Sequence, residues 1–402
     1  MSAMETSKAM RMALALNSGS SSLKFGLFQT TTSGLTTVLT GEADAIGSPQ
    51  SRFTARDADG KIVANETAPV PDQRAAMNCV VRTLANEGMP TPDAIGHRMV
   101  HGGPALRSDV RISPAVLLQL EGAKGFAPLH IPVALSVIAV ALEQFPNVAQ
   151  VACFDTSFHR GMPLHARTLP IPRALKSEGI ERYGFHGLSC ESIVLQMGHP
   201  MPERLIIAHL GNGSSITAVR HGKSIDTSMG LTPTGGIIMG TRTGDLDPGV
   251  LVYLLRERKL NVEQLDALLQ RESGLRGVSG VSSDMRQLRA AAAIHNDASA
   301  DAQLAIDMYC IAAAKQIAAM ITSLDGVDAI VFTGGIGEND TKTRAAICSR
   351  LCWIGVQLDV QANAASSRTI SAATSRCAVH VIRSEETQQI ARRALGVSQP
   401  RS

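Results

Sequence analysis

Two stretches of the chain repeat one pattern, in which an apolar strand, a turn of small polar residues and a second strand follow one another. The turns are Asn17–Ser22 and His209–Ser215, and the flanking strands are residues 14–16 with 23–28 and residues 205–208 with 216–219. Each copy predicts a β-hairpin whose tip of Gly, Ser and Asn lets backbone N–H groups and hydroxyls converge on phosphate oxygens. A single tip of this kind is as readily an ordinary turn. Two copies, roughly half a chain apart, predict a nucleotide held between two related halves.

A third strand ends in glycines at Ile330–Asn339 and reinforces this prediction. The strand covers 329–332, and its glycine turn is expected to open a helix over 342–351. Before it, apolar residues from Asp301 onward recur at helical spacing and predict a core helix. In the first half we expect a helix over 74–86, strands that end near Arg98 and Asp155, and, over 51–73, a surface hairpin and loop outside the core.

Composition places the chain among two-domain globular proteins. Its 402 residues are more than a single hydrophobic core usually organises, so we expect two domains. The content of 44% hydrophobic and 18% charged residues is typical of a globular protein. A net charge of +3 without a dense Lys/Arg run predicts no nucleic-acid partner. The apolar run Ile131–Leu142 is too short to cross a bilayer, and residues 1–12 lack a signal-peptide core, so no membrane partner is expected. Seven scattered cysteines, of which Cys348 and Cys352 lack further zinc ligands, fit reduced thiols in a cytoplasmic protein.

Arg98, Arg242 and His186 are candidate active-site residues because each is flanked by glycines that let a ligand approach. A guanidinium offers a planar set of donors that suits phosphoryl oxygens, so two arginines could neutralise a transferring phosphoryl group. An isolated arginine more often forms a surface ion pair than binds a ligand. The neighbouring glycines make phosphoryl binding and a surface ion pair equally good interpretations. His186 in Gly-Phe-His-Gly exposes an imidazole that can donate to developing negative charge, whereas His159 and His165 are better explained as structural residues. No histidine spacing indicates a metal site.

Eight ordered motifs between residues 13 and 395 resemble the acetate kinase (acetokinase) family. They are Asn17-x-Gly-Ser-Ser-Ser-Leu-Lys24, Gly96-His-Arg-x-Val-His-Gly-Gly103, Ala127-Pro-Leu-His130, Phe154-Asp-Thr-x-Phe-His159, Arg182-Tyr-Gly-Phe-His-Gly187, His209-Leu-Gly-Asn-Gly-Ser-Ser215, Gly240-Thr-Arg-x-Gly-Asp-x-Asp-Pro248 and Gly334-Gly-Ile-Gly-Glu-Asn339.

The resemblance implies an α/β fold of two duplicated, actin-like (ribonuclease H-like) lobes with a central nucleotide cleft, as in the actin, hexokinase and Hsp70-like superfamily. The expected N-terminal lobe is 1–157 completed by 386–402, and the nucleotide-binding lobe is 158–385. The implied activity is the reversible, in-line transfer of the γ-phosphoryl group of ATP to acetate, giving acetyl phosphate and ADP. The resemblance also implies a cytoplasmic homodimer. Mg²⁺, with Mn²⁺ as an alternative, is the implied cofactor.

The resemblance also assigns residues to roles. Arg98, His186 and Arg242 would stabilise the transferring phosphoryl group, and Asn17 and Glu385 would place the metal. The implied nucleotide-binding residues are Lys24, His209, Leu210, Gly211, Asn212, Gly213, Asp284, Met285, Arg286, Gly334, Gly335, Ile336, Gly337, Glu338 and Asn339. Acetate is already ionised near neutral pH and needs no general base, so we assign Asp155 to metal binding or active-site organisation rather than to proton removal.

Four further residues match the family's small apolar pocket for the acetate methyl, namely Val100, Leu129, Phe185 and Pro233. The resemblance also assigns Arg98 to substrate binding. Thr234-Gly-Gly follows Pro233 where the usual pattern is Leu-Glu-Gly, and Met285 stands where some members carry an aromatic. Two alternatives stay open. A propionate or butyrate kinase would need a wider pocket than Val100 leaves, and an Hsp70-like ATPase without an acyl acceptor would not need the paired arginines and His186.

Overall fold

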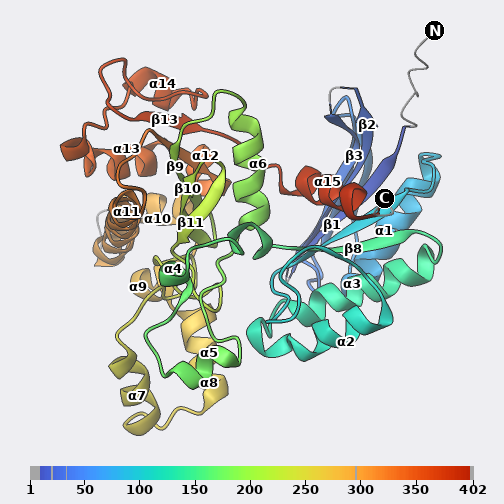
Figure 1. Ribbon diagram of the computed structural model, residues 1–402, viewed down its shortest axis with the longest axis horizontal. Coiled ribbons are helices and arrows are strands. Elements are labelled where there is room, and N and C mark those ends of the chain that lie inside the picture. The colour runs from blue at the N-terminus through green and yellow to red at the C-terminus, as the bar shows by residue number, and fades with distance from the viewer. Residues whose placement is uncertain (1–9, 20, 33, 295–296, 399–402) are drawn as a thin grey trace. The chain divides into compact units, whose positions relative to one another are not determined.

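The computed structural model describes residues 10–19, 21–32, 34–294 and 297–398. Ser20 of the first predicted tip and most of the N-terminal stretch considered for a signal peptide lie outside these residues. Over the described ranges the chain divides into two compact units (Figure 1). Unit 1 comprises residues 1–157 and 385–402, and unit 2 comprises residues 158–384.

Unit 1 is built on a mixed sheet whose strand order is β5-β4-β3-β2-β1-β6-β8-β7. Strands β1 to β5 form antiparallel hairpins, whereas β6 pairs in parallel with both β1 and β8. The strands are β1 Met12–Ser18, β2 Leu23–Thr31, β3 Gly34–Asp44, β4 Arg52–Asp57, β5 Ile62–Thr67, β6 Ala94–Met99, β7 Val110–Arg111 and β8 Ala149–Phe154. The helices are α1 Gln73–Asn86, α2 Pro114–Gly122, α3 Ile131–Gln144 and α15 Glu386–Ser398.

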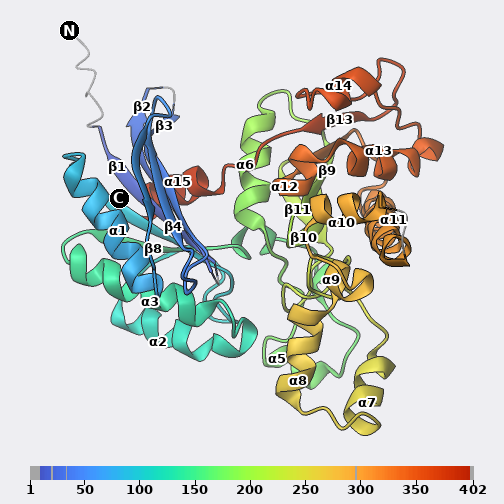
Figure 2. The same cartoon turned by 180° about the vertical axis from the view of Figure 1, so that it is seen from behind.

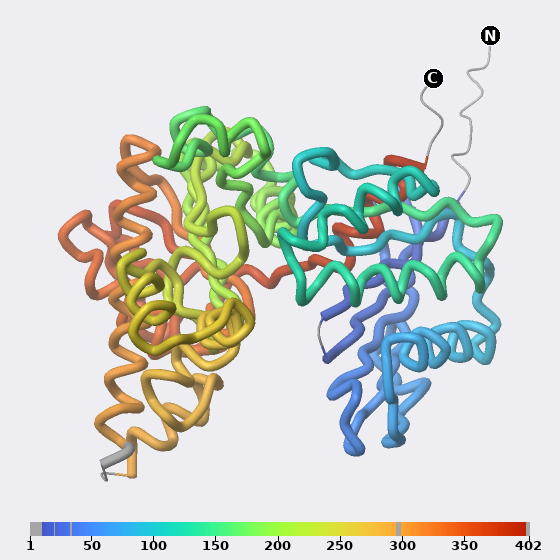
Figure 3. Tube along the Cα trace, turned by 90° about the horizontal axis from the view of Figure 1, so that it is seen from below, coloured from blue at the N-terminus to red at the C-terminus, as the bar shows by residue number. Residues whose placement is uncertain are grey.

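Helices cover both faces of this sheet (Figures 1 and 3). Helices α1 and α3 pack on one face, where Ile95 of β6 joins a buried cluster with Met77 and Val137. Helix α15, from the far end of the sequence, lies on the other face, toward which the next residue of β6, Gly96, is turned. A Cβ on Gly96 would lie 2.6 Å from a side-chain carbon of Ile390, so only glycine lets α15 approach this closely.

Unit 2 contains a second sheet, in the order β11-β10-β9-β12-β13. Strands β9, β10 and β11 are antiparallel, and β12 runs parallel to β9 and β13. The strands are β9 Arg204–Leu210, β10 Ser214–Arg220, β11 Lys223–Thr227, β12 Ala329–Thr333 and β13 Ala378–Val381. The helices are α4 Leu164–Arg167, α5 Arg173–Ser177, α6 Gly187–Met197, α7 Pro248–Arg256, α8 Val262–Ala267, α9 Gly274–Ser279, α10 Met285–Ala292, α11 Asp297–Leu324, α12 Gly334–Asn339, α13 Thr341–Ser349 and α14 Val360–Ala364.

The strand β9 lies between α6 and α11 (Figure 2), and its alternate side chains pack with different helices. Leu205 and Ile207 pack with Ile193 of α6, whereas Ile206 and Ala208 join the cluster that contains α11. Within the described residues, the stretch Ser299–Leu324 of α11 is long and apolar enough to span a membrane. Its buried face, however, is part of the core of unit 2, as helical spacing from Asp301 onward predicted.

The two sheets repeat one strand order. In unit 1 the segment β3-β2-β1-β6-β8 has antiparallel pairings from β1 to β2 and from β2 to β3 on one side, and parallel pairings from β1 to β6 and from β6 to β8 on the other. The segment β11-β10-β9-β12-β13 has the same pairings in the same order. Both predicted hairpins are present, as β1–β2 and β9–β10. The α/β fold and the duplication expected from the sequence are therefore confirmed.

Two local predictions are wrong. Residues 51–73 do form a hairpin, but Phe53 and Ala55 are fully buried, and Phe53 stacks on Phe25 with ring centroids 5.7 Å apart. Exposed polar residues alternate with these two along the strand, so the sequence did not indicate that one of its faces is buried. The glycines of 334–339 form no open turn, because α12 begins at Gly334 itself; the backbone of Gly334 has φ +77°, and a Cβ there would lie 2.7 Å from the carbonyl oxygen of Leu210.

Candidate active site

The ends of three adjacent strands bring Asn17, Arg98 and Asp155 together in unit 1. Leu16 of β1 is in register with His97 of β6, so the next residues, Asn17 and Arg98, are neighbours. Arg98 is in turn in register with Cys153 of β8, and Asp155 follows directly after that strand. Because parallel strands end at the same edge of a sheet, the topology alone explains this grouping. The sequence had singled out all three residues without predicting that they touch.

The half-buried Arg98 forms an ion pair with the buried Asp155. The Nη2 of Arg98 lies 2.7 Å from Oδ2 of Asp155, its Nε donates to both carboxylate oxygens, and its Nη1 donates to Oδ1 of Asn17 at 3.2 Å. Burial opposes the charge of Arg98, but Asp155 and Glu386 raise the pKa of the guanidinium above its ordinary value. Burial raises the pKa of Asp155, and the contact with Arg98 opposes that rise. The aspartate therefore fixes the orientation of a permanently charged guanidinium.

Glu386 belongs to the same group, although sequence reasoning selected its neighbour Glu385. The amide of Asn17 donates to Oε2 of Glu386 at 3.2 Å. The pair of adjacent acidic residues was the signal that could have indicated it. Within the described ranges no three His, Cys, Asp or Glu side chains gather as a metal cage. An amide oxygen with one or two carboxylates is nevertheless the kind of partial donor set with which proteins hold Mg²⁺ against substrate phosphates.

The second hairpin tip, between β9 and β10, is closely surrounded by active-site candidates of unit 2. A Cβ on Gly213 would lie 3.2 Å from Nε2 of His186 and 3.6 Å from Nη1 of Arg242. Arg242 also donates to the carbonyl oxygen of Pro233 at 3.1 Å. On the other side of the tip, the N–H of Gly240 donates to the backbone oxygen of Asn212. The side chain of Asn212 occupies the space that a Cβ on Gly240 would need. The structure thus gathers Gly213, His186 and Arg242, which lie far apart in the sequence.

His186 is held in an uncommon backbone conformation and stacks on His209. Its φ of +57° lies in the left-handed region, which non-glycine residues rarely occupy unless the surroundings impose it. The two imidazole centroids are 4.1 Å apart with an interplanar angle of 20°. Nδ1 of His186 is 3.0 Å from Oγ of Ser215, and Nδ1 of His209 is 2.8 Å from Oγ of Ser189. The stack was not predicted, because β9 and the loop before α6 are separate in the sequence.

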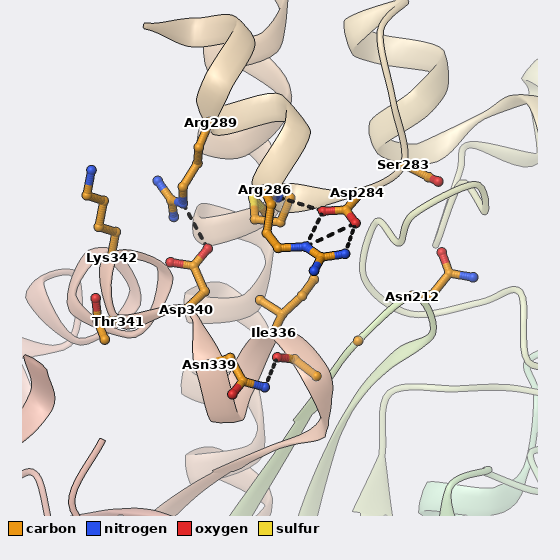
Figure 4. Close-up of a pocket in the computed structure, with 13 residues that line it drawn as sticks. Asn212, Ser283, Asp284, Arg286, Arg289, Ile336, Asn339, Asp340, Thr341 and Lys342 are labelled. Atoms are coloured by element: carbon orange, nitrogen blue, oxygen red, sulfur yellow. Dashed lines mark hydrogen bonds and ion pairs between the residues drawn. The ribbon is translucent and has the colours of Figure 1, made fainter. Parts of the chain in front are cut away.

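A pocket of about 810 Å³ opens beside this tip within unit 2 (Figure 4). Its size is within the range of cavities that bind nucleotide-sized ligands. Eight of the residues assigned to the nucleotide line it: Gly211, Asn212, Asp284, Met285, Arg286, Gly335, Ile336 and Asn339. Sequence reasoning missed the other lining residues: Ser283, Arg289, Asp340, Thr341 and Lys342.

Ion pairs organise the polar wall of the pocket. Arg286 bonds to Asp284, and Nε of Arg289 lies 2.8 Å from Oδ2 of Asp340 (Figure 4). The contact with Arg286 lowers the pKa of Asp284. Burial alone would raise the pKa of Asp340, but Arg289 and Thr343 lower it. Both carboxylates are therefore ionised and paired, and the wall carries Lys342 in addition.

The remaining nucleotide assignments do not line this pocket. Leu210 is buried, and Gly334, Gly337 and Glu338 form the inner part of α12. Lys24 belongs to unit 1, where its ammonium lies 3.8 Å from a carboxylate oxygen of Glu42. The predicted acyl-pocket residues are divided in the same way, with Val100 and Leu129 in unit 1 and Phe185 and Pro233 in unit 2. Val100, Phe185 and Pro233 are buried and Leu129 is half-buried.

A duplicated α/β sheet, with a glycine tip and a glycine-rich helix lining one pocket, defines a nucleotide-binding protein of the two-domain kinase type. A model of the acetokinase family matches residues 12–392, and the chain belongs to this family.

Similar proteins agree with this assignment over nearly the whole chain. The acetate kinase of Nitrobacter hamburgensis is 41% identical over 97% of this chain and 96% of its own length. The acetate kinase of Methylocella silvestris is 41% identical over 96% of this chain and 98% of its own length. Among solved structures, a propionate kinase from Francisella tularensis has a TM-score of 0.88 at 35% identity, covering 96% of this chain and all of that one. The acetate kinase of Porphyromonas gingivalis has a TM-score of 0.84 at 33% identity, covering 97% of this chain and all of that one.

Proposed function

We propose that the protein transfers the γ-phosphoryl group of ATP to acetate, reversibly and by direct in-line displacement, giving acetyl phosphate and ADP. The observation that carries this proposal is the Arg98–Asp155 pair in a member of the acetokinase family. Its aspartate is engaged with a guanidinium and is not poised as a base, and acetate has no proton to lose near neutral pH. Positioning and charge neutralisation can then supply most of the catalysis.

The transferring phosphoryl group would be stabilised by Arg98, Arg242 and His186. The proximity of Gly213 to both His186 and Arg242 supports this, because the nitrogens of both side chains lie beside one small turn. Arg242 is anchored on the carbonyl of Pro233, a residue that we assign to the acyl pocket. Phosphoryl stabilisation and acyl binding are thereby linked through one guanidinium.

The nucleotide would bind in the 810 Å³ pocket, with its adenosine against Asp284–Arg286 and its phosphates toward α12 and Gly211–Gly213. Mg²⁺ would be held by Asn17 together with Glu385 or Glu386, and it would supply charge neutralisation of the β- and γ-phosphates. The hydrogen bond from Asn17 to Glu386 supports this donor set, because it places an amide and a carboxylate within reach of one another. Mn²⁺, which accepts the same oxygen ligands, is the alternative ion.

Acetate is the acyl substrate that a wall of Val100, Leu129, Phe185 and Pro233 would favour. Propionate is the second candidate, because one solved neighbour is a propionate kinase and an apolar pocket discriminates one methylene by only about 1–3 kcal/mol. We further propose a cytoplasmic homodimer. In support of an interface, α7 and the residues beside it expose Leu246, Val250 and Tyr253 at 43%, 40% and 55%. Sedimentation equilibrium would give the subunit number.

The test is hydroxamate trapping of acyl phosphate with acetate, propionate and butyrate in parallel, each with MgATP. We expect acetate to give the highest rate, propionate a lower one and butyrate the lowest. ATP hydrolysis that is independent of the acid, without hydroxamate, would overturn the proposal in favour of an ATPase. A preference for propionate would reassign the acyl substrate while leaving the phosphotransfer intact.

A further inference from the structure

Ser384 is the last residue of unit 2, and its backbone is hydrogen-bonded to α12, a helix from which other residues line the pocket. Its N–H donates to Oε1 of Glu338 at 3.0 Å, and the same oxygen accepts the N–H of Gly334 at 3.0 Å. Gly334 is the first residue of α12, and Glu338 belongs to the same helix. Glu338 therefore holds both the start of α12 and the segment that leads to Ser384, a role inside the protein that differs from nucleotide contact.

The side chain of Ser384 belongs to a second set of hydrogen bonds. Its Oγ donates to Oγ of Ser189 at 2.9 Å, and Oγ of Ser189 lies 2.8 Å from Nδ1 of His209. Ser189 is fully buried in the first turn of α6. A hydroxyl carries one hydrogen, so a chain that runs from Ser384 to Ser189 and on to His209 delivers the hydrogen of Ser189 to Nδ1. The ring hydrogen of neutral His209 then resides on Nε2.

The histidine that receives this chain is the one that stacks on His186. A Cβ on Gly211 would lie 4.0 Å from Nε2 of His209, just as one on Gly213 would lie 3.2 Å from Nε2 of His186. Both rings are therefore anchored at Nδ1 by serine hydroxyls and turn their Nε2 edges toward the same glycine tip. A ring whose tautomer and plane are fixed is a rigid support for its stacking partner.

We propose that Ser384 and Ser189 act as a positioning relay, which fixes His209 as the Nε2–H tautomer and, through the imidazole stack, sets the orientation of His186. The relay deepens the proposed function, on which it rests, because His186 is there assigned to the transferring phosphoryl group. Neither serine touches substrate in this scheme. Their effect on the reaction runs through His209 and then through His186.

Replacement of each serine tests the relay. Ser384→Ala removes the hydroxyl but keeps the N–H that bonds to Glu338, and Ser189→Ala removes the donor to Nδ1. We expect each to lower kcat for acetyl phosphate formation about tenfold, with little change in KM for ATP, because one network hydrogen bond is lost while the pocket is retained. Ser384→Thr keeps a hydroxyl at a half-buried position and should restore most of the rate.

Ser192→Ala is the matched control. Ser192 is buried on the same helix as Ser189, and its hydroxyl donates to the carbonyl oxygen of Ser189 within the helix turn at 2.8 Å. A loss in Ser192→Ala equal to that in Ser189→Ala would show that removing any buried hydroxyl from α6 slows the enzyme. That result would overturn the relay.

A spectroscopic reading separates positioning from general damage. In protein labelled with ¹⁵N at histidine, the His209 signals are identified by their loss in His209→Gln. The wild type should show the Nε2–H pattern, and Ser189→Ala should lose it. An unchanged His209 tautomer in Ser189→Ala, or turnover within twofold of wild type in Ser384→Ala, would contradict the relay. If the wild type forms no acyl phosphate at all, the proposed function fails, and the tautomer measurement still decides the relay.

Discussion

The two units use one strand order to present different chemistry at equivalent positions. The next-to-last residue of the central strand is Asn17 in β1 and His209 in β9. Asn17 bonds to Arg98 and Glu386 and so belongs to an ionic group, whereas His209 lies among serine hydroxyls and a second imidazole. The repeated topology therefore fixes where a side chain is presented, and the residue at that position decides which interactions it can make. Duplication supplied two such positions, which then diverged.

The largest expected effect comes from removing the charge that each unit contributes. Arg98→Ala in unit 1 and Arg242→Ala in unit 2 should each lower kcat by about 10²-fold or more, because each guanidinium stabilises charge that is largest in the transition state. The KM for ATP should change little, and lysine should restore only part of the rate because it lacks the planar fork. Steady-state kinetics measure both constants.

Two arginines in surface ion pairs provide matched controls for these variants. Arg74 pairs with Glu143 in unit 1 and Arg204 with Asp328 in unit 2. Alanine at either should leave turnover close to that of the wild type, since exposed pairs contribute little. Near-normal turnover in one of the two active-site variants would assign that arginine to structure and break the functional symmetry between the units.

A smaller effect should appear in the pH dependence of stability, to which each unit contributes one buried histidine. Burial lowers the pKa of His97 in unit 1 and of His159 in unit 2 to about 4. The native histidines stay neutral where unfolded ones, with a pKa of about 6.5, take up a proton. Their contribution is therefore complete above about pH 6.5 and is lost as the pH falls toward 4, by about 2 kcal/mol per histidine between pH 6.5 and 5.

Urea unfolding of the wild type, His97→Gln and His159→Gln across this pH range measures that dependence. Each single variant should have a shallower slope, and the double variant the shallowest. Since the histidines lie in different units, the two changes should add. Slopes identical to that of the wild type would mean that neither histidine is neutral and buried in the native state.

The smallest expected effect concerns the acyl wall, where Val100 represents unit 1. Val100→Ala should open room for about one methylene and raise the propionate-to-acetate ratio of kcat/KM by up to roughly tenfold, on the scale of about 1 kcal/mol. Acetate should bind more weakly. Val116→Ala, which shortens a valine of similar burial on α2, serves as the control. An unchanged ratio, or a parent enzyme that already prefers propionate, would show that Val100 does not set acyl length.

Much of the fold was predictable because its signals are local. The hairpins β1–β2 and β9–β10 were visible as apolar strands around small polar tips, and α11 as a helical period of buried residues. The helical form of Gly334–Asn339 was not, since a glycine-rich stretch has low helix propensity. Its helix is supported by tertiary contacts, including the bond from Glu338 back to the N–H of Gly334.

The candidate site was predictable in its residues and not in its contacts. Arg98, Asp155, His186 and His209 could be selected by residue type and neighbouring glycines or by family resemblance. That Arg98 is paired with Asp155, or that the two histidines stack, depends on strand register and on the backbone of a loop, which no single segment encodes. Ser189 and Ser384 gave no signal at all, because a buried serine looks like any other in sequence.

Because α15 packs closely on Gly96 and comes from the end of the sequence, unit 1 can be completed only late in synthesis. The strands of unit 1 leave the ribosome first, but the helix that covers one face of them is made only after all of residues 158–384. At about 5–20 residues per second, that interval lasts roughly 10–45 s. Throughout it, the nascent sheet has an apolar face without its native cover, and it is there that a chaperone would be needed.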